Sequence, residues 1–206
     1  MLELLQSALE QAHALTAWEA VAVLLAIAYL LLAMRENILC WYCAFFSTAI
    51  YIYLFWNVSL LMESALNLYY LLMAVYGWYQ WRHGGKSKQG AQIRVMGLQR
   101  NLLCLLIIAL LTVSSGWLLG SYTGAAWPYV DSFTTWGSVL TTIMVARKIL
   151  ENWVYWIVID SVSIFLYLDR GLYLTAVLFM AYVVIVIFGF FHWRKLMLEQ
   201  ESRAAS

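Results

Sequence analysis

The stretch from Glu151 to Tyr167 is mostly apolar and aromatic, and an aspartate, Asp160, lies near its middle. At helical steps of three and four residues, the aspartate shares one face with two indoles, a hydroxyl and a phenol, from Trp153, Trp156, Ser163 and Tyr167. A carboxylate at the centre of a membrane helix costs about 2.5–3.5 kcal/mol on insertion scales, so it usually faces a bundle interior or a wet cavity. We therefore expect this face to line a binding site for an aromatic cation.

Other polar residues follow the same helical spacing elsewhere in the chain. Glu63, Asn67 and Tyr70 share one face of a second apolar stretch, and Asp131 and Ser138 lie on a third. Facing stripes of this kind could enclose a polar pocket. Glu63 and Asp131 lie near the outer ends of their stretches, where contact with water explains a charged residue equally well. The predicted substrate-binding residues are Asp160, Asn67, Trp153, Trp156, Tyr70, Asn152, Ser163, Glu63, Asp131 and Ser138.

Composition limits the classes of protein to which the chain can belong. Of its 206 residues 65% are hydrophobic, whereas soluble domains have about 45–50% apolar residues. This excess predicts an integral membrane protein. Charged residues make up 11% and nearly balance, which argues against a nucleic-acid surface. Eleven tryptophans exceed what anchoring at the bilayer interface needs, so some aromatic rings are expected to touch a ligand.

No motif indicates a cofactor, a metal or an enzyme. Cys40 and Cys43 form a C-x-x-C pair, but no second pair or nearby histidine completes a metal site, and small packing residues are the simpler interpretation. Gly84-Gly85-Lys86 lacks the spacing of a phosphate-binding loop, and no nucleophile stands beside a base. A transporter or binding protein is therefore favoured over an enzyme.

The apolar stretches predict an all-helical fold with seven transmembrane spans of about 20 residues each. They cover residues 18–34, 39–56, 60–81, 98–119, 129–146, 152–168 and 172–193. Residues 1–17 are predicted to form an amphipathic interfacial helix, 82–97 a basic cytoplasmic loop, 120–128 a turn and 194–206 a cytoplasmic tail. With the N-terminus outside, all Lys and Arg residues except Arg170 face the cytoplasm, as cytoplasmic loops favour.

An internal repeat relates the two ends of the chain. Gly189 follows Gly77 by 112 residues, and the same offset relates Trp193 to Trp81. Residues 18–81 therefore repeat as 129–193, and the single span 98–119 between them gives both bundles the same orientation. Parallel repeats of this kind are a known transporter plan. Asp160 pairs with Thr48 under this offset, so the carboxylate is not demanded by the repeated scaffold.

Three motifs resemble those of the PnuC-type vitamin transporters, which carry nicotinamide riboside or, in the PnuT group, thiamine. They are Tyr76-Gly77-Trp78-Tyr79-x-Trp81, Asp131-Ser132 and Arg147-Lys148-x-x-Glu151-Asn152-Trp153-x-x-Trp156. The resemblance implies a three-plus-one-plus-three helix topology like that of SWEET proteins, a homotrimer in the bacterial inner membrane, and facilitated diffusion. The imported vitamin would then be trapped by phosphorylation, with a cytoplasmic vitamin kinase as the functional partner.

The resemblance also implies roles for residues of the pocket. The ligand ring would stack on Trp153 and Trp156, with Asn67 and Asp160 at polar positions. The nicotinamide riboside pattern has Gln, Asn and Asn where this chain has Asn67, Ala74 and Asp160. These departures and the added carboxylate favour thiamine slightly over nicotinamide riboside as the cationic substrate. A nicotinamide riboside transporter, a proton-coupled vitamin carrier and a membrane scaffold without transport are the alternatives.

Overall fold

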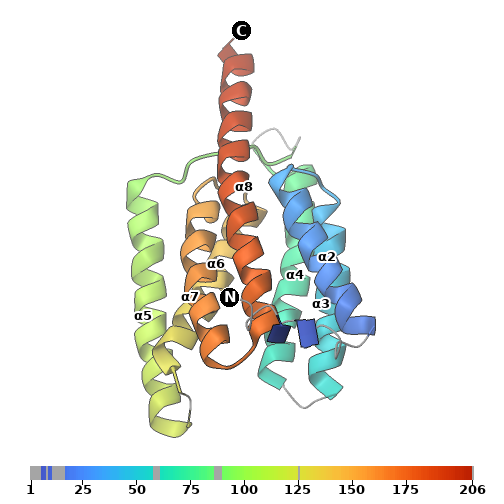
Figure 1. Ribbon diagram of the computed structural model, residues 1–206. Helices are drawn as coiled ribbons and strands as arrows, with labels where there is room; N and C mark the ends of the chain where they lie inside the picture. The colour runs from blue at the N-terminus through green and yellow to red at the C-terminus, as the bar shows by residue number, and fades with distance from the viewer. Residues whose placement is uncertain are drawn as a thin grey trace.

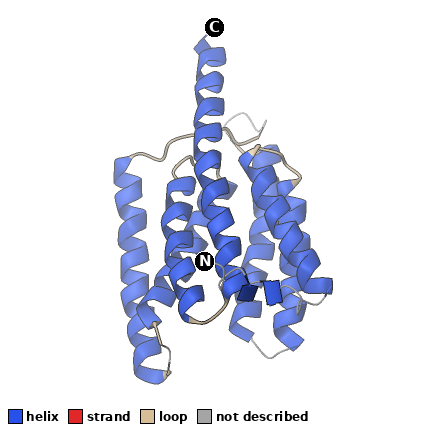
Figure 2. Cartoon of the chain, viewed as in Figure 1, coloured by secondary structure: helices blue, strands red, loops and turns tan. Residues whose placement is uncertain are grey.

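The computed structural model describes residues 6–7, 9–10, 17–57, 61–85, 90–124 and 126–205, and its elements in these ranges are helices (Figures 1 and 2). Seven long helices follow one another along the chain. They are α2 (Ala17–Met34), α3 (Cys40–Asn57), α4 (Leu61–His83), α5 (Leu98–Tyr122), α6 (Pro128–Ala146), α7 (Asn152–Asp169) and α8 (Tyr173–Ala205). The interfacial helix predicted over residues 1–17 lies almost entirely outside the described residues.

Local sequence features account for several helix ends. Pro128 occupies the first turn of α6, where its fixed φ suits a helix and its missing N–H is not needed. Gly171, with φ of 69°, makes the turn between α7 and α8. Residues 194–205 of the predicted tail belong to α8, which continues to Ala205 and rises above the rest of the molecule (Figure 1).

Successive helices pack on one another both before and after α5, and we name the three helices on each side a triplet. In the first triplet α2 contacts α3 and α3 contacts α4, and in the second triplet α6 contacts α7 and α7 contacts α8. Helix α5 packs on α6 at one side of the molecule (Figure 1). The two triplets meet where α2 contacts α8 and where α4 contacts α6.

Equivalent residues make equivalent contacts in the two triplets. The Trp41 ring lies against Gly77, and the Trp153 ring lies against Gly189 in the same way. The two rings meet Trp81 and Trp193 edge-on, with centroids 5.4 and 5.2 Å apart and both interplanar angles at 88°. These glycines let an indole approach the backbone, which agrees with the packing role expected of small residues in membrane bundles.

The same indoles join one triplet to the other. Trp81 Nε1 donates to the Val145 carbonyl at 3.2 Å, and Trp193 Nε1 donates to the Ala33 carbonyl at 3.0 Å. Val145 follows Ala33 by the repeat offset of 112 residues, so the two bonds are reciprocal. The Trp81 and Trp193 rings also lie against each other, with centroids 5.8 Å apart. The internal repeat of the sequence is therefore a near-symmetric arrangement in space.

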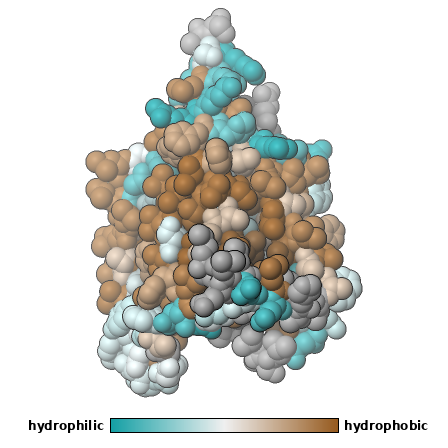
Figure 3. Space-filling model, viewed as in Figure 1, coloured by the Kyte–Doolittle hydropathy of each residue, from teal (hydrophilic) through white to brown (hydrophobic). Residues whose placement is uncertain are grey.

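Surface hydropathy fits a molecule that lies in a bilayer. Apolar residues form a broad band over the middle of the helices, and polar residues gather where α8 projects (Figure 3). Within the described residues, α2, α5 and α8 are each long and apolar enough to cross a membrane. The other four helices carry more polar and aromatic side chains. Three of them, α4, α6 and α7, contain the predicted substrate-binding residues.

Candidate functional site

Helix α7 turns the predicted polar face inward. Trp153, Asp160 and Ser163 are buried, and Trp156 and Tyr167 are half-buried. The opposite face is exposed at Val154, Val158 and Phe165. This agrees with the helical spacing, which placed the carboxylate on the side away from lipid. Asp160 is only 4% exposed, halfway along the helix.

A group of aromatic side chains reaches the Asp160 carboxylate through Tyr182. The Tyr182 phenol of α8 lies close enough to interact electrostatically with Asp160 and with the phenols of Tyr51 and Tyr167. Phe179 links two of these rings, with centroids 4.9 Å from Tyr167 and 5.3 Å from Tyr182. A carboxylate among aromatic rings is a suitable environment for an organic cation, which both the charge and the ring faces attract.

Trp153 and Trp156 occupy different environments. Trp153 is 1% exposed and fills the space between Gly189 and Trp193, so its ring is already engaged in packing. Trp156 is half-buried at the margin of the core cluster. Of the two indoles, Trp156 is therefore the better placed to stack on a ligand.

Three of the predicted polar residues bond within their own segment. The Asn152 side chain is fully buried, and its Nδ2 donates to the Ile149 carbonyl at 2.6 Å. The Ser163 hydroxyl donates to the Ile159 carbonyl one turn earlier, at 2.9 Å. Ser138 is half-buried, and its carbonyl accepts a 2.7 Å bond from the Thr142 hydroxyl. Such local bonds stabilise the backbone. They are therefore only weak evidence that these three residues contact a ligand.

On α4, Asn67 and Tyr70 are half-buried. The Tyr70 ring packs against Tyr69, with centroids 5.5 Å apart, and interacts electrostatically with Tyr29 of α2. Tyr69 donates to the Val139 carbonyl of α6 at 2.8 Å, which ties the two triplets together beside the predicted site. The Glu63 side chain lies outside the described part of the structure.

Asp131 belongs to a different cluster. Its carboxylate pairs with the guanidinium of Arg170 at 2.5 Å, and Trp127 Nε1 donates to Asp169 at 2.7 Å nearby. Both interactions join the start of α6 to the end of α7, at the end of the molecule away from the α8 extension. Asp131 therefore has a structural partner, and the contacts described here do not bring it together with Asp160.

One interaction was missed by the sequence reasoning. Lys148 Nζ pairs with the Glu36 carboxylate at 2.6 Å and lies 4.7 Å from the centroid of the Trp81 ring. Both residues have left-handed backbones, with φ of 51° for Lys148 and 56° for Glu36. They are separated by the repeat offset of 112 residues, so equivalent positions with opposite charges meet where the triplets join. Opposite charges under this offset were the signal that could have revealed the pair.

Comparison with a known structure identifies the fold. A crystal structure of the vitamin B3 transporter PnuC matches with a TM-score of 0.70, covering 95% of this chain and 90% of that one at 22% identity. The fold is thus that of an all-helical integral membrane protein. The sequence profile of the nicotinamide mononucleotide transporter family matches residues 16–195, so the chain belongs to this family. The resemblance to PnuC-type transporters is confirmed.

Curated relatives are also transporters. The nicotinamide riboside transporter PnuC of Escherichia coli is 24% identical over 91% of this chain and 89% of its own length. The riboflavin/roseoflavin transporter RibM of Streptomyces davaonensis is 26% identical over 60% of this chain and 59% of its own length. The PnuC of Haemophilus influenzae is 28% identical over 71% of this chain and 65% of its own length. These relatives support a transporter rather than an enzyme.

Proposed function

We propose that this protein imports an unphosphorylated, cationic B vitamin across the bacterial inner membrane. The observation that carries the proposal is Asp160, a buried carboxylate halfway along a membrane helix of a transporter-family protein. An intramembrane acid is costly unless a partner or a wet cavity offsets the cost, and such acids usually mark a transport path. A ring-bearing cation would supply a partner for the charge and for the nearby Tyr182 phenol.

Thiamine is the substrate that we favour, and nicotinamide riboside is the second candidate. Both carry a cationic ring, and a carboxylate could also accept a bond from the amino group of the thiamine pyrimidine. Asn67, Ala74 and Asp160 depart from the nicotinamide riboside pattern, which supports thiamine. The names of the E. coli and H. influenzae relatives support nicotinamide riboside instead.

The site residues would contribute to binding in different ways. Asp160 would anchor the ligand, Asn67 would supply an amide contact, and Trp156 and Tyr70 would stack on its rings. Trp153 would support the site by holding α7 against α8. Asn152, Ser163 and Ser138 would shape the backbone around it, and Glu63 and Asp131 would lie toward the outer entrance.

The topology that we propose has three helices, one linking helix and three more helices, with the N-terminus outside. The basic residues Arg35, Arg82, Arg147 and Arg194 would then face the cytoplasm, as the positive-inside rule favours. The α8 extension would project into the cytoplasm. We further propose a homotrimer and a cytoplasmic kinase that traps the imported vitamin by phosphorylation.

Transport would proceed by rocking of one triplet against the other. The reciprocal bonds of Trp81 and Trp193, together with the Glu36–Lys148 pair, join the triplets at their basic ends. We infer that these contacts close the cytoplasmic side of the path and must separate before substrate leaves. Equivalent contacts suit this role, because they can break and re-form without unfolding either triplet.

Uptake into liposomes tests the proposal. Purified protein is reconstituted, and entry of labelled thiamine, nicotinamide riboside and riboflavin is followed side by side, with empty liposomes as the control. We expect saturable uptake of a cationic vitamin, thiamine first, without ATP or an imposed pH gradient. Uptake that requires a pH gradient would favour the proton-coupled carrier. Failure to bind or pass any of the three vitamins would favour the scaffold.

A further inference from the structure

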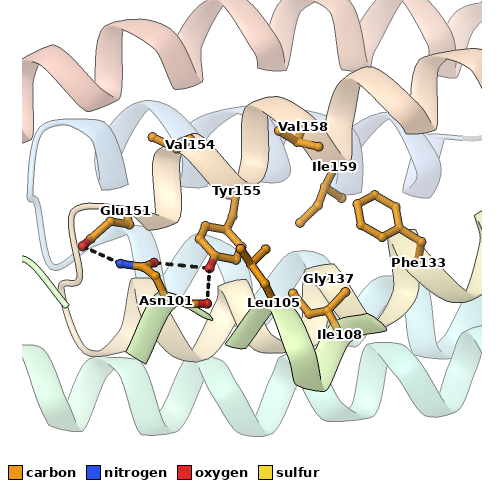
Figure 4. Close-up of a pocket in the computed structure, with 10 residues that line it drawn as sticks. All are labelled: Asn101, Leu105, Ile108, Phe133, Gly137, Glu151, Val154, Tyr155, Val158 and Ile159. Carbon is orange, nitrogen blue, oxygen red and sulfur yellow. Dashed lines mark hydrogen bonds between the residues drawn. The ribbon is translucent and has the colours of Figure 1, made fainter. Parts of the chain in front are cut away.

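A cavity lies among α5, α6 and α7. Its volume is about 280 Å³, and its walls are mostly apolar, including Leu105 and Ile108 of α5, Phe133 of α6 and Val158 of α7. Figure 4 shows a polar group at one end, formed by Glu151, Asn101 and Tyr155, and apolar side chains toward the other. Asp160 is not among the lining residues, so this cavity is distinct from the proposed vitamin site.

The cavity is a slot between two helices over a third. Helix α5 packs on α6, and α6 packs on α7, while the packed pairs of described helices do not include α5 with α7. Gly137 of α6 lies at the base of the slot and lets the Ile159 side chain pack closely, because a Cβ at Gly137 would lie 3.0 Å from that side chain. Since its walls carry few groups that could bind water, a slot of this kind in a membrane favours hydrocarbon.

The length of the slot suits one acyl chain from one leaflet. Glu151, which precedes the first residue of α7, and Ile159 within α7 lie at its two ends, and a separation of eight residues corresponds to about 12 Å along a helix. Half of the hydrocarbon core of a bilayer is about 15 Å thick. A chain that enters at the basic end would therefore reach the apolar end close to the bilayer midplane.

The polar groups at one end of the slot form hydrogen bonds with one another and with the neighbouring loop. The Glu151 carboxylate accepts bonds from the Met96 backbone N–H at 2.9 and 3.0 Å and from Asn101 Nδ2 at 3.1 Å. The Tyr155 hydroxyl donates to Asn101 Oδ1 at 3.2 Å. The neighbouring loop is fixed by two backbone bonds, from Arg94 N–H to the Lys148 carbonyl at 3.0 Å and from Leu150 N–H to the Arg94 carbonyl at 2.9 Å.

Two exposed arginines lie close in sequence to the residues at this end. Arg94 and Arg100 are exposed, and they lie two residues from Met96 and next to Asn101, respectively. The nearby Glu151 carboxylate already accepts bonds from two donors, the Met96 backbone N–H and Asn101 Nδ2, so we expect the two guanidiniums to be available to a phosphate. Basic residues at the cytoplasmic side of a helix pocket favour anionic lipid head groups.

We propose that this slot holds one acyl chain of an anionic phospholipid, phosphatidylglycerol in kind, with its phosphate at Arg94 and Arg100. The lipid packs between α5 and α7, and it fixes the position of the linking helix relative to the second triplet. This site is independent of which vitamin is carried.

Two variants and their control test the site. Val158→Trp fills the slot from its exposed wall, and Arg100→Gln removes the charge of one of the two arginines. Arg194→Gln removes an exposed arginine of α8 and serves as the matched control. The probes are phosphatidylglycerol and phosphatidylethanolamine added to delipidated protein, with retention measured by native mass spectrometry. Thermal unfolding of each variant checks that it is folded.

We expect wild-type protein to retain phosphatidylglycerol in preference to phosphatidylethanolamine. Arg100→Gln should weaken retention about 5-fold, since one basic residue near the surface contributes about 1 kcal/mol. Val158→Trp should abolish retention, and Arg194→Gln should leave it unchanged. A phosphatidylglycerol with a photoreactive chain should crosslink to residues 101–108 or 154–159. Equal retention of both lipids, crosslinks spread over all helices, or crosslinks between two copies of the protein would each overturn the proposal.

Discussion

The two triplets of helices share their indole packing and differ in their polar positions. Trp41 lies on Gly77 in the first triplet, as Trp153 lies on Gly189 in the second. By contrast, Thr48 bonds to the Ala44 carbonyl of its own helix at 2.8 Å, whereas its counterpart Asp160 is a buried carboxylate near the Tyr182 phenol. The shared positions are explained by packing alone. The positions that differ are therefore where a ligand site is expected.

The ion pair that joins the triplets is expected to give the largest effect on stability. Lys148→Met leaves Glu36 unpaired in a mostly buried setting, which should lower the free energy of unfolding by about 3–5 kcal/mol. Denaturant unfolding in detergent measures this effect. Exchanging the charges with Glu36→Lys and Lys148→Glu together should recover most of it, because the positions are equivalent in the repeat. No recovery in the exchanged variant would contradict the symmetric account. Lys195→Met, at an exposed pair 4.0 Å apart, is the control and should change little.

Alanine at the two glycines compares the packing of the triplets directly. An added methyl group at Gly77 or Gly189 would press into the Trp41 or Trp153 ring, so each variant should lose about 1–3 kcal/mol of stability. The loss should be larger at Gly77, where the ring lies closer. Gly124 has no atom within 4 Å of an added Cβ, and Gly124→Ala is the matched control. Thermal unfolding that is unchanged at both sites would show that the indoles do not need the glycines.

Phenylalanine at Trp81 and Trp193 removes the reciprocal bonds while keeping an aromatic ring. Each change should lower the free energy of unfolding by about 0.5–1.5 kcal/mol because a hydrogen bond is lost, and the loss should be similar at the two sites. Under the rocking mechanism, both variants should alter the rate of uptake more than the affinity for substrate. Trp117→Phe, at an indole 57% exposed, should leave stability and uptake unchanged. A change in affinity alone would contradict a gating role.

Valine at Thr48 should have the smallest effect. Its hydroxyl bonds only within α3 among the contacts described, so Thr48→Val should change stability by less than about 0.5 kcal/mol. Uptake should stay within about 2-fold of wild type by the same reasoning. A large loss of uptake would place the first triplet's equivalent position in the site, and would remove the contrast with Asp160.

Much of the fold could be predicted from the sequence because helical spacing and the repeat offset are both periodic signals. Spacing placed Asp160 and Ser163 on the buried face of α7, and the offset paired Gly77 with Gly189 before their indole contacts were seen. The extension of α8 beyond Trp193 was missed, since polar residues after an apolar span fit a helix as well as a loop. Helix ends depend on capping and solvation, which leave weak traces in composition.

The site was harder to predict than the fold. A buried Trp gives the same pattern whether it stacks on a ligand or fills a core, and the packing of Trp153 against Gly189 depends on a contact between α7 and α8. Likewise, the amide of Asn152 bonds to its own loop, which helical spacing does not reveal. The lipid-facing slot between α5 and α7 depends on how far apart these helices pack, and local sequence does not set that distance.

The most direct test of the account is the affinity of Asp160→Asn for thiamine, measured by calorimetry on purified protein beside wild type and Thr48→Val. Neutral riboflavin serves as the second ligand. A bond to a charged group contributes about 1.5–3 kcal/mol, so the variant should bind thiamine about 10- to 100-fold more weakly, while Thr48→Val binds as wild type does. Equal affinity of Asp160→Asn and wild type for thiamine and for nicotinamide riboside would contradict the central claim that Asp160 anchors a cationic ligand.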